Sequence, residues 1–298
     1  MIKKIGLFLT LSAFCPVWLH AQDDLLQLAQ GDNAQQKQKV LATFKTTKLI
    51  NAQTNETVKH RTLDVRIGHR FGNVGSESNG GIHTFYGLDA ASDIRIAFEY
   101  GITDRLMAGI SRSKRQENYE GLVKFRALEQ TTDHKIPVAV TVFANAAITG
   151  IRDPEGLYPK FTDRITYAFQ AIIARKFTDR ISFMVLPTLV HRNYVFQNEA
   201  KNDLLAVGAG VRFRFSKSSS VVADYFYNFD KLRKPGNDNG YFQPLGIGFE
   251  IETGGHAFTI MFSNSAGIIE NDFIPNTTDD WMSGGFKFSF NISRNFRL

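Results

Sequence analysis

The last stretch of the chain alternates between apolar and polar residues, with Arg294 as the one exception. From Phe286 to Leu298 the even positions carry Phe, Phe, Phe, Ile, Arg, Phe and Leu, whereas the odd positions carry Lys, Ser, Asn, Ser, Asn and Arg. A period of two is typical of a β-strand, because successive side chains point to opposite faces of the sheet. The alternation lasts about thirteen residues, roughly twice the usual length of a soluble strand and sufficient for a tilted strand to cross a bilayer.

The same alternation recurs along the rest of the chain and predicts twelve strands in all. The apolar stripes occupy residues 63–71, 94–100, 106–112, 119–127, 136–148, 165–173, 181–189, 205–215, 221–229, 241–251, 258–262 and 286–298. An even number of strands fits a single-chain bacterial barrel with both termini on one side of the membrane. The sequence therefore predicts an all-β fold: a twelve-stranded antiparallel up-and-down transmembrane β-barrel with a short periplasmic N-terminal arm.

The connections between these stripes alternate in length. Residues 102–105, 177–180, 216–219 and 253–255 form tight turns, whereas the other set is mostly longer and holds most of the Asn, Asp, Gly and Pro. Short periplasmic turns and long outer loops are typical of outer-membrane barrels. Segment 113–117 is an exception, because it is short although it belongs to the set of long outer loops. The bacterial outer membrane is therefore the predicted location.

The N-terminus reads as a targeting segment followed by an arm. Lys3 and Lys4 precede an apolar run over 5–19, and Ala21 precedes the expected cleavage site, so we assign 1–21 to a cleaved signal peptide. Cys15 is the only cysteine, and its removal leaves no thiol for a disulfide or a metal. Residues 22–56 are predicted to be a periplasmic arm or plug segment, with a disordered tail as the alternative. Residues 57–298 are assigned to the barrel.

Charge and histidine spacing narrow the possible partners. The formal net charge is +6 and the pI is about 9.3, but acids and bases are interspersed in an exported chain, so we expect no nucleic-acid partner. The histidines show no HExxH motif or other compact ligand spacing. We therefore predict no metal site and no cofactor.

An outer-membrane lipid hydrolase is the rival class, because some twelve-stranded barrels are lipases with Ser and His on the lipid-facing surface. The nearest candidates here are His256, Ser263 and Ser265, with His191 four strands away. At ~3.3 Å per residue, His256 and Ser263 would lie about 23 Å apart along one strand. A general base must be within hydrogen-bond reach of its nucleophile. We therefore predict no catalytic residues and no enzyme.

Four segments resemble a bacterial family of membrane-bound β-barrels of unknown function. They are IARKF (173–177), LPTLVHRN (186–193), GFEIETGGHAF (248–258) and the closing FNISRNF (290–296). The similarity extends from about residue 44 to the C-terminus. It implies an outer-membrane barrel and carries no assigned ligand or active residue.

The strand alternation also assigns charged side chains to the lumen. They include Arg66, Arg70, Arg95, Glu99, Lys124, Arg126, Arg212, Arg214, Asp224, Glu250 and Glu252. Bases outnumber acids in this set, and a basic lumen raises the local anion concentration. The predicted function is a narrow passive channel or transporter for small polar or anionic solutes, with weak anion selectivity. We expect conductance to grow when 22–56 are deleted, and selectivity to disappear when Arg212 and Arg214 become Gln.

The alternative function is a non-conducting barrel that acts as a scaffold or docking protein for a periplasmic complex. The partners predicted on these interpretations are outer-membrane lipid, a small polar or anionic solute, and a periplasmic protein. The lumen-side glycines provide either room for a plug or solute, or relief of strain at a bend: Gly208, Gly210, Gly246 and Gly248. Pro187 lacks a backbone donor, so we expect a bulge at that position.

Overall fold

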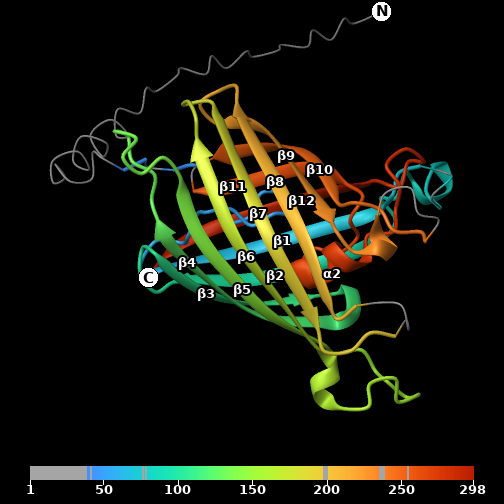
Figure 1. The fold of residues 1–298 in the computed structure, drawn as a ribbon. Coiled ribbons are helices and arrows are strands. Elements are labelled where there is room, and N and C mark those ends of the chain that lie inside the picture. Colours follow the sequence, from blue (N-terminus) through green and yellow to red (C-terminus); the bar gives the residue numbers. More distant parts are fainter. Residues whose placement is uncertain are drawn as a thin grey trace, which may run out of the picture. The chain divides into compact units, whose positions relative to one another are not determined.

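The chain from residue 39 onward folds into one closed antiparallel barrel (Figure 1). The computed structural model describes residues 39–40, 42–75, 77, 79–196, 201–234, 239–253 and 255–298. The predicted signal peptide and residues 22–38 of the predicted arm lie outside this described part. The strands follow one another around the ring in chain order, and β1 pairs with β12 to close it.

The predicted fold class, with its twelve strands, is confirmed. The strands are β1 (Thr62–Asn73), β2 (Ala91–Gly101), β3 (Leu106–Ser113), β4 (Asn118–Leu128), β5 (Ala139–Thr149), β6 (Ile165–Lys176), β7 (Ile181–Arg192), β8 (Asp203–Arg214), β9 (Ser219–Asn228), β10 (Leu245–Thr253), β11 (His256–Ser263) and β12 (Lys287–Arg297). Each strand pairs with the two strands next to it in the ring, so every strand edge is hydrogen-bonded, as a barrel in a bilayer requires.

The two ends of the barrel differ in their connections. Of the described residues, the turn end carries 102–105, 129–138, 177–180, 215–218 and 255, together with the C-terminus. The loop end carries 74–75, 77, 79–90, 114–117, 150–164, 193–196, 201–202, 229–234, 239–244 and 264–286. The expected bulge at Pro187 is wrong, because β7 keeps one register with β6 and with β8 on both sides of the proline. Proline has no backbone N–H group, so one hydrogen bond of the ladder is missing at Pro187. The strand nevertheless contains no extra residue there.

The apolar face of every strand points outward. Large hydrophobic side chains stay exposed around the whole ring, among them Ile67, Phe98, Phe125, Phe169, Phe213 and Phe249. The residues between them are buried inside; many of these are polar, but β6, β7 and β9 also turn apolar side chains inward, such as Ile172, Leu186 and Phe226. A soluble sheet has the opposite arrangement, because its apolar face is removed from water. The outward apolar face is therefore one that lipid covers.

The interior holds two segments that are not part of the sheet. Residues 42–58, here called the lumen hairpin, fold back on themselves through backbone bonds from Leu49 to Ala52 and from Thr54 to Thr47. Ile50 at its tip has no exposed surface. From the loop end, the connection between β11 and β12 contributes the short helix α2 (Glu270–Asn276), whose residues are almost all buried (Figure 1).

Glycines on the lumen side make space for these contents. A Cβ on Gly246 would lie 2.5 Å from Cγ2 of Ile50, and one on Gly210 would collide with Met184 and approach Leu49. At Gly208 the collision would be with the ring of Phe226, and at Gly248 with backbone of the neighbouring strand. The glycines of β8 and β10 therefore admit the hairpin and the side chains packed around it.

Candidate functional site

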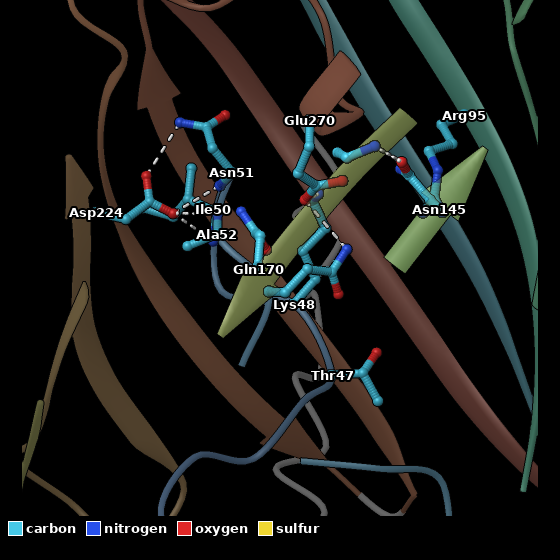
Figure 2. Close-up of polar contacts among 12 residues, drawn as sticks. Thr47, Lys48, Ile50, Asn51, Ala52, Arg95, Asn145, Gln170, Asp224 and Glu270 are labelled. Carbon is cyan, nitrogen blue, oxygen red and sulfur yellow. Dashed lines mark hydrogen bonds and ion pairs between the residues drawn. The ribbon is translucent and has the colours of Figure 1, made fainter. Parts of the chain in front are cut away.

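The tip of the lumen hairpin is bound by a single carboxylate of the barrel wall. Oδ2 of Asp224 on β9 accepts hydrogen bonds from the backbone N–H groups of Ile50 (3.2 Å), Asn51 (2.7 Å) and Ala52 (2.8 Å) (Figure 2). Oδ1 accepts a bond from Nδ2 of Asn51 at 3.0 Å. Successive N–H groups at a tight turn converge on one point and form a concave anion site. The hairpin therefore presents its positive end to a buried acid.

Side chains of β1 and β11 bind the tip as well. Nη2 of Arg70 donates to the carbonyl oxygen of Ile50 (3.1 Å) and to Oδ1 of Asn51 (3.2 Å). Nδ2 of Asn51 also donates to Oγ of Ser263 at 3.2 Å. β9, β11 and β1 lie within one arc of the ring, so that part of the wall holds Ile50 and Asn51 at the tip.

The two legs of the hairpin are bound by bases of β1 and β4. Nζ of Lys124 donates to the carbonyl oxygens of Thr47 (2.8 Å) and Thr54 (3.2 Å). Nη2 of Arg66 donates to Oγ1 of Thr47 at 2.8 Å, and that hydroxyl donates to Oε2 of Glu99 at 2.6 Å. Lys124 has no exposed surface, so carbonyl oxygens of the hairpin take the place that water would occupy around its ammonium group.

Nearer the turn end, ion pairs hold the base of the hairpin and Lys39, which precedes it. Nη2 of Arg126 lies 3.0 Å from Oε2 of Glu56. Lys39 and Arg105 lie 2.7 Å and 2.9 Å from Oε2 of Glu129, in the connection between β4 and β5. Burial raises the pKa of Glu129, but the hydrogen bonds from Lys39 and Arg105 outweigh it and leave that pKa below the ordinary value.

The hairpin and α2 meet inside the barrel. Nζ of Lys48 lies 2.8 Å from Oε1 of Glu270, and both side chains are at most 2% exposed (Figure 2). Nε2 of Gln53 donates to the same oxygen at 3.2 Å. The ammonium group of Lys48 also lies 5.7 Å from the ring centre of Phe273. Segments that start from opposite ends of the barrel are thus joined by one buried ion pair.

The structure buries nearly all of the predicted lumen charges. Arg66, Arg70, Arg95, Glu99, Lys124, Arg126, Arg212, Asp224 and Glu250 are buried, whereas Arg214 and Glu252 are half-buried at the turn end. Ion pairs between wall residues alone include Arg95 with Glu120, Arg212 with Glu250 and Arg66 with Asp64, at 2.7, 2.7 and 2.9 Å. Arg66, Arg70, Lys124 and Arg126 bind the hairpin, so Arg66 takes part in both kinds of contact.

The residues considered for lipid hydrolysis lie apart. Ser263 and Ser265 have no exposed surface; Oγ of Ser263 accepts from Asn51, and Oγ of Ser265 contacts the hydroxyl of Thr277. His256 begins β11 at the turn end, while Ser263 ends that strand at the loop end. Among the described residues, no group of three or more His, Cys, Asp or Glu could hold a metal ion. No helix in the same residues is long and apolar enough to cross a membrane.

Sequence reasoning missed the contribution of the last loop. The strand alternation does not single out Lys48, Glu270 and Phe273, because Lys48 lies in the predicted arm and the other two lie in the long connection before the last strand. One signal was available, since Ile268, Ile269, Phe273 and Ile274 are more apolar than a solvated loop requires, and all are buried. A cluster of that kind in a long connection indicates a segment that folds inward.

The family model described as "Membrane bound beta barrel domain (DUF5777)" matches residues 44–296. Similar solved structures include the NanC porin (10% identity, TM-score 0.46, 79% of this chain and 100% of that one), the KdgM porin (7%, 0.47, 79% and 99%) and the outer membrane protein Omp33 of Acinetobacter baumannii (11%, 0.41, 79% and 98%). No curated protein matches the chain.

Proposed function

The chain belongs to the membrane bound beta barrel domain family (DUF5777), and from this premise we propose that it is an outer-membrane channel for small anionic solutes that its own lumen hairpin holds closed. On this proposal the turn end faces the periplasm, as in other single-chain barrels whose termini and short turns lie on that side. The lumen hairpin then reaches in from the periplasm and α2 from the outer side.

One observation carries the proposal: the lumen bases bind oxygen atoms of the hairpin. Arg66, Arg70 and Lys124 donate to hydroxyl, amide and carbonyl oxygens of residues 47–54. Without the hairpin, these buried cations would face an open lumen with fewer acceptors. Bare bases lining a narrow aqueous path attract anions and repel cations. The hairpin therefore occupies the place where a passing anion would bind.

The manner in which the hairpin is held supports its release. In the described residues, the backbone bonds of 42–58 to backbone groups run within the hairpin itself, and the wall holds it through side chains. Withdrawal would thus leave the hydrogen-bond ladder of the barrel intact. A segment that shares no ladder with the sheet can move without opening the membrane-spanning wall.

A reversible lock tests the proposal. Since a Cβ on Gly246 would lie so close to Ile50, the pair I50C and G246C fits the short Cβ separation of a disulfide, about 3.5–4.5 Å. The only natural cysteine, Cys15, lies in the predicted signal peptide. In planar bilayers we expect the oxidised double variant to stay closed and the reduced one to open intermittently, because its hairpin tip can undock. The single variant I50C, which cannot form the disulfide, is the control. Its conductance should not change when reductant is added.

Deletion and charge variants complete the test. Removal of residues 42–58 should raise the conductance with a preference for anions, and R66Q with K124Q in that background should weaken the preference. The pair R212Q and R214Q is less informative than the sequence suggested, because Arg212 is already paired with Glu250. Heat-modifiable mobility on gels shows that each variant has folded. A folded deletion variant that does not conduct would contradict the channel.

The second candidate function is a non-conducting barrel that serves as an anchor or docking protein. The contact between Lys48 and Glu270 favours it, because the hairpin and α2 meet and fill the lumen from both ends. Under that function neither reduction of the I50C and G246C disulfide nor deletion of residues 42–58 would produce conductance in planar bilayers. The same experiment therefore separates the two candidates.

A further inference from the structure

A polar cavity opens beside the lumen hairpin at the turn end of the barrel. Its volume is about 680 Å³, and its walls come from the hairpin, from the connection between β8 and β9, and from the turn-end parts of β10, β11, β12 and β1. This space is present while the hairpin is in place. It is therefore a separate feature from the lumen that the hairpin fills.

The acidic side chains that line this cavity are already paired with bases. Glu252 lies 2.9 Å from Lys45 and 3.3 Å from Arg212. Glu56 is paired with Arg126 at 3.0 Å, and Asp64 with Arg66 at 2.9 Å. None of these carboxylates is left to neutralise a further cation, so any additional base in the lining contributes an excess positive charge.

Three such bases line the cavity. Lys59, Lys217 and Arg297 have neither an ion pair nor a side-chain hydrogen bond within the described residues. They come from the hairpin exit, a turn-end connection and the end of β12, so their charges surround the opening from different sides. A concave surface lined by charge of one sign concentrates ions of the opposite sign.

A buried acceptor in the same lining needs a donor. Asp64 is 3% exposed, and although its Oδ2 is paired with Arg66, its Oδ1 has no hydrogen-bond partner among the described residues. A buried carboxylate oxygen without a donor costs free energy, about 1–3 kcal/mol in typical cases. A small rotation of the Asp64 side chain toward the cavity would let a ligand hydroxyl donate to this oxygen and remove that cost, whereas a simple anion would be repelled by it.

From the cavity, its excess bases and this acceptor, we propose that the turn end binds a small hydroxylated organic anion of the sugar-acid class. The acid group of the ligand is held by Lys217 and Arg297, with Lys59 adding to the field. A hydroxyl of the ligand donates to Oδ1 of Asp64. The site does not depend on the proposed conductance, because a silent barrel with the same cavity would bind the same ligand.

The test is a calorimetric titration of the full-length mature protein in detergent with three probes. D-Glucuronate carries both an acid and hydroxyl groups, D-glucose only hydroxyls, and acetate only the acid. We expect saturable binding of glucuronate, at least tenfold weaker binding of acetate and none of glucose. Absence of saturable glucuronate binding by the unaltered protein, or equal binding of acetate, would overturn the proposal.

Variants assign the two halves of the site. K217Q with R297Q removes exposed charges and should weaken glucuronate binding at least tenfold. R294Q is the matched control, because Arg294 lies on the same strand but over the ring of Phe296 on the lipid-facing side. It should leave the affinity unchanged, and an equal loss in both would point to a general surface effect and refute the site.

The hydroxyl contact has its own readout. D64N removes a negative charge, so acetate should bind as well as before or more tightly, while the preference for glucuronate over acetate falls. Opposite changes for the two probes cannot come from misfolding, which would weaken both. An unchanged preference in a variant that retains heat-modifiable mobility would refute the role of Asp64.

Discussion

The substitution Asp224→Asn measures how strongly the carboxylate of the barrel wall holds the tip of the lumen hairpin. The replacement keeps the shape of the side chain and removes its charge. Oδ2 of Asp224 accepts three backbone N–H groups, and Oδ1 accepts the amide of Asn51. The Asn variant can offer one oxygen to the three N–H groups, but its own amide must face the amide of Asn51, so one bond is lost and three become neutral.

The size of the effect follows from those bonds. A hydrogen bond to a charged group contributes about 1.5–3 kcal/mol and a neutral one about 0.5–1.5 kcal/mol, so each of the three bonds loses roughly 1 kcal/mol. Burying an amide in place of a carboxylate recovers part of the desolvation cost. We expect a net loss of about 2 kcal/mol in the docking of the tip, which corresponds to about 30-fold more frequent opening at ~1.4 kcal/mol per factor of ten.

Hydrogen–deuterium exchange of the amides of residues 50–52 measures that opening directly, since these are the groups that Asp224 holds. The matched control is Glu250→Gln, an equally conservative change at a buried acid whose side-chain hydrogen bond comes from Arg212 of the wall. The control should leave exchange at 50–52 unchanged. Equal protection of these amides in D224N and in the unaltered protein would show that the carboxylate does not hold the tip.

Three further changes test the packing of the lumen. K48M leaves Glu270 buried without its cation and should cost about 3–5 kcal/mol, whereas K48M with E270M should recover most of that loss; the gel-shift temperature of the barrel measures both. G246L should displace the hairpin tip and speed exchange at residues 50–52, whereas G121L, at a glycine with open space around its Cβ position, should not. The pKa of Glu129 is held below its ordinary value of 4.5, so its ion pairs contribute fully to stability above that pH and are lost as the pH falls through the lower folded pKa. Hydrogen–deuterium exchange at the start of the hairpin, corrected for the intrinsic rate, should become faster in that pH range. In E129Q it should show no such change.

The sequence by itself determined the barrel and the sidedness of its strands. The alternation from Phe286 to Leu298 and its repeats require one apolar and one polar face, because a strand has a period of two and a one-residue shift would reverse every side chain. The sorting of short and long connections determined which end carries the turns. Both the alternation and the lengths of the connections are local features of the sequence. They can therefore be recognised without knowing which distant strands pair. The bulge expected at Pro187 was wrong for a related reason, since the missing donor concerns one bond while the register is held by many.

Only the tertiary structure decided what fills the lumen. Nothing local in the sequence indicates that Asp224 would accept the N–H groups of residues 50–52, or that Lys48 would meet Glu270, more than two hundred residues away. A polar face toward the lumen has the same alternation whether water, solute or the chain's own hairpin lies against it. The partner of each inward charge depends on closure of the ring, which brings β1, β4, β9 and α2 around one small volume. A buried charge without a partner costs free energy. The hairpin supplies hydrogen-bond partners for Arg66, Arg70, Lys124, Arg126 and Asp224 of the wall.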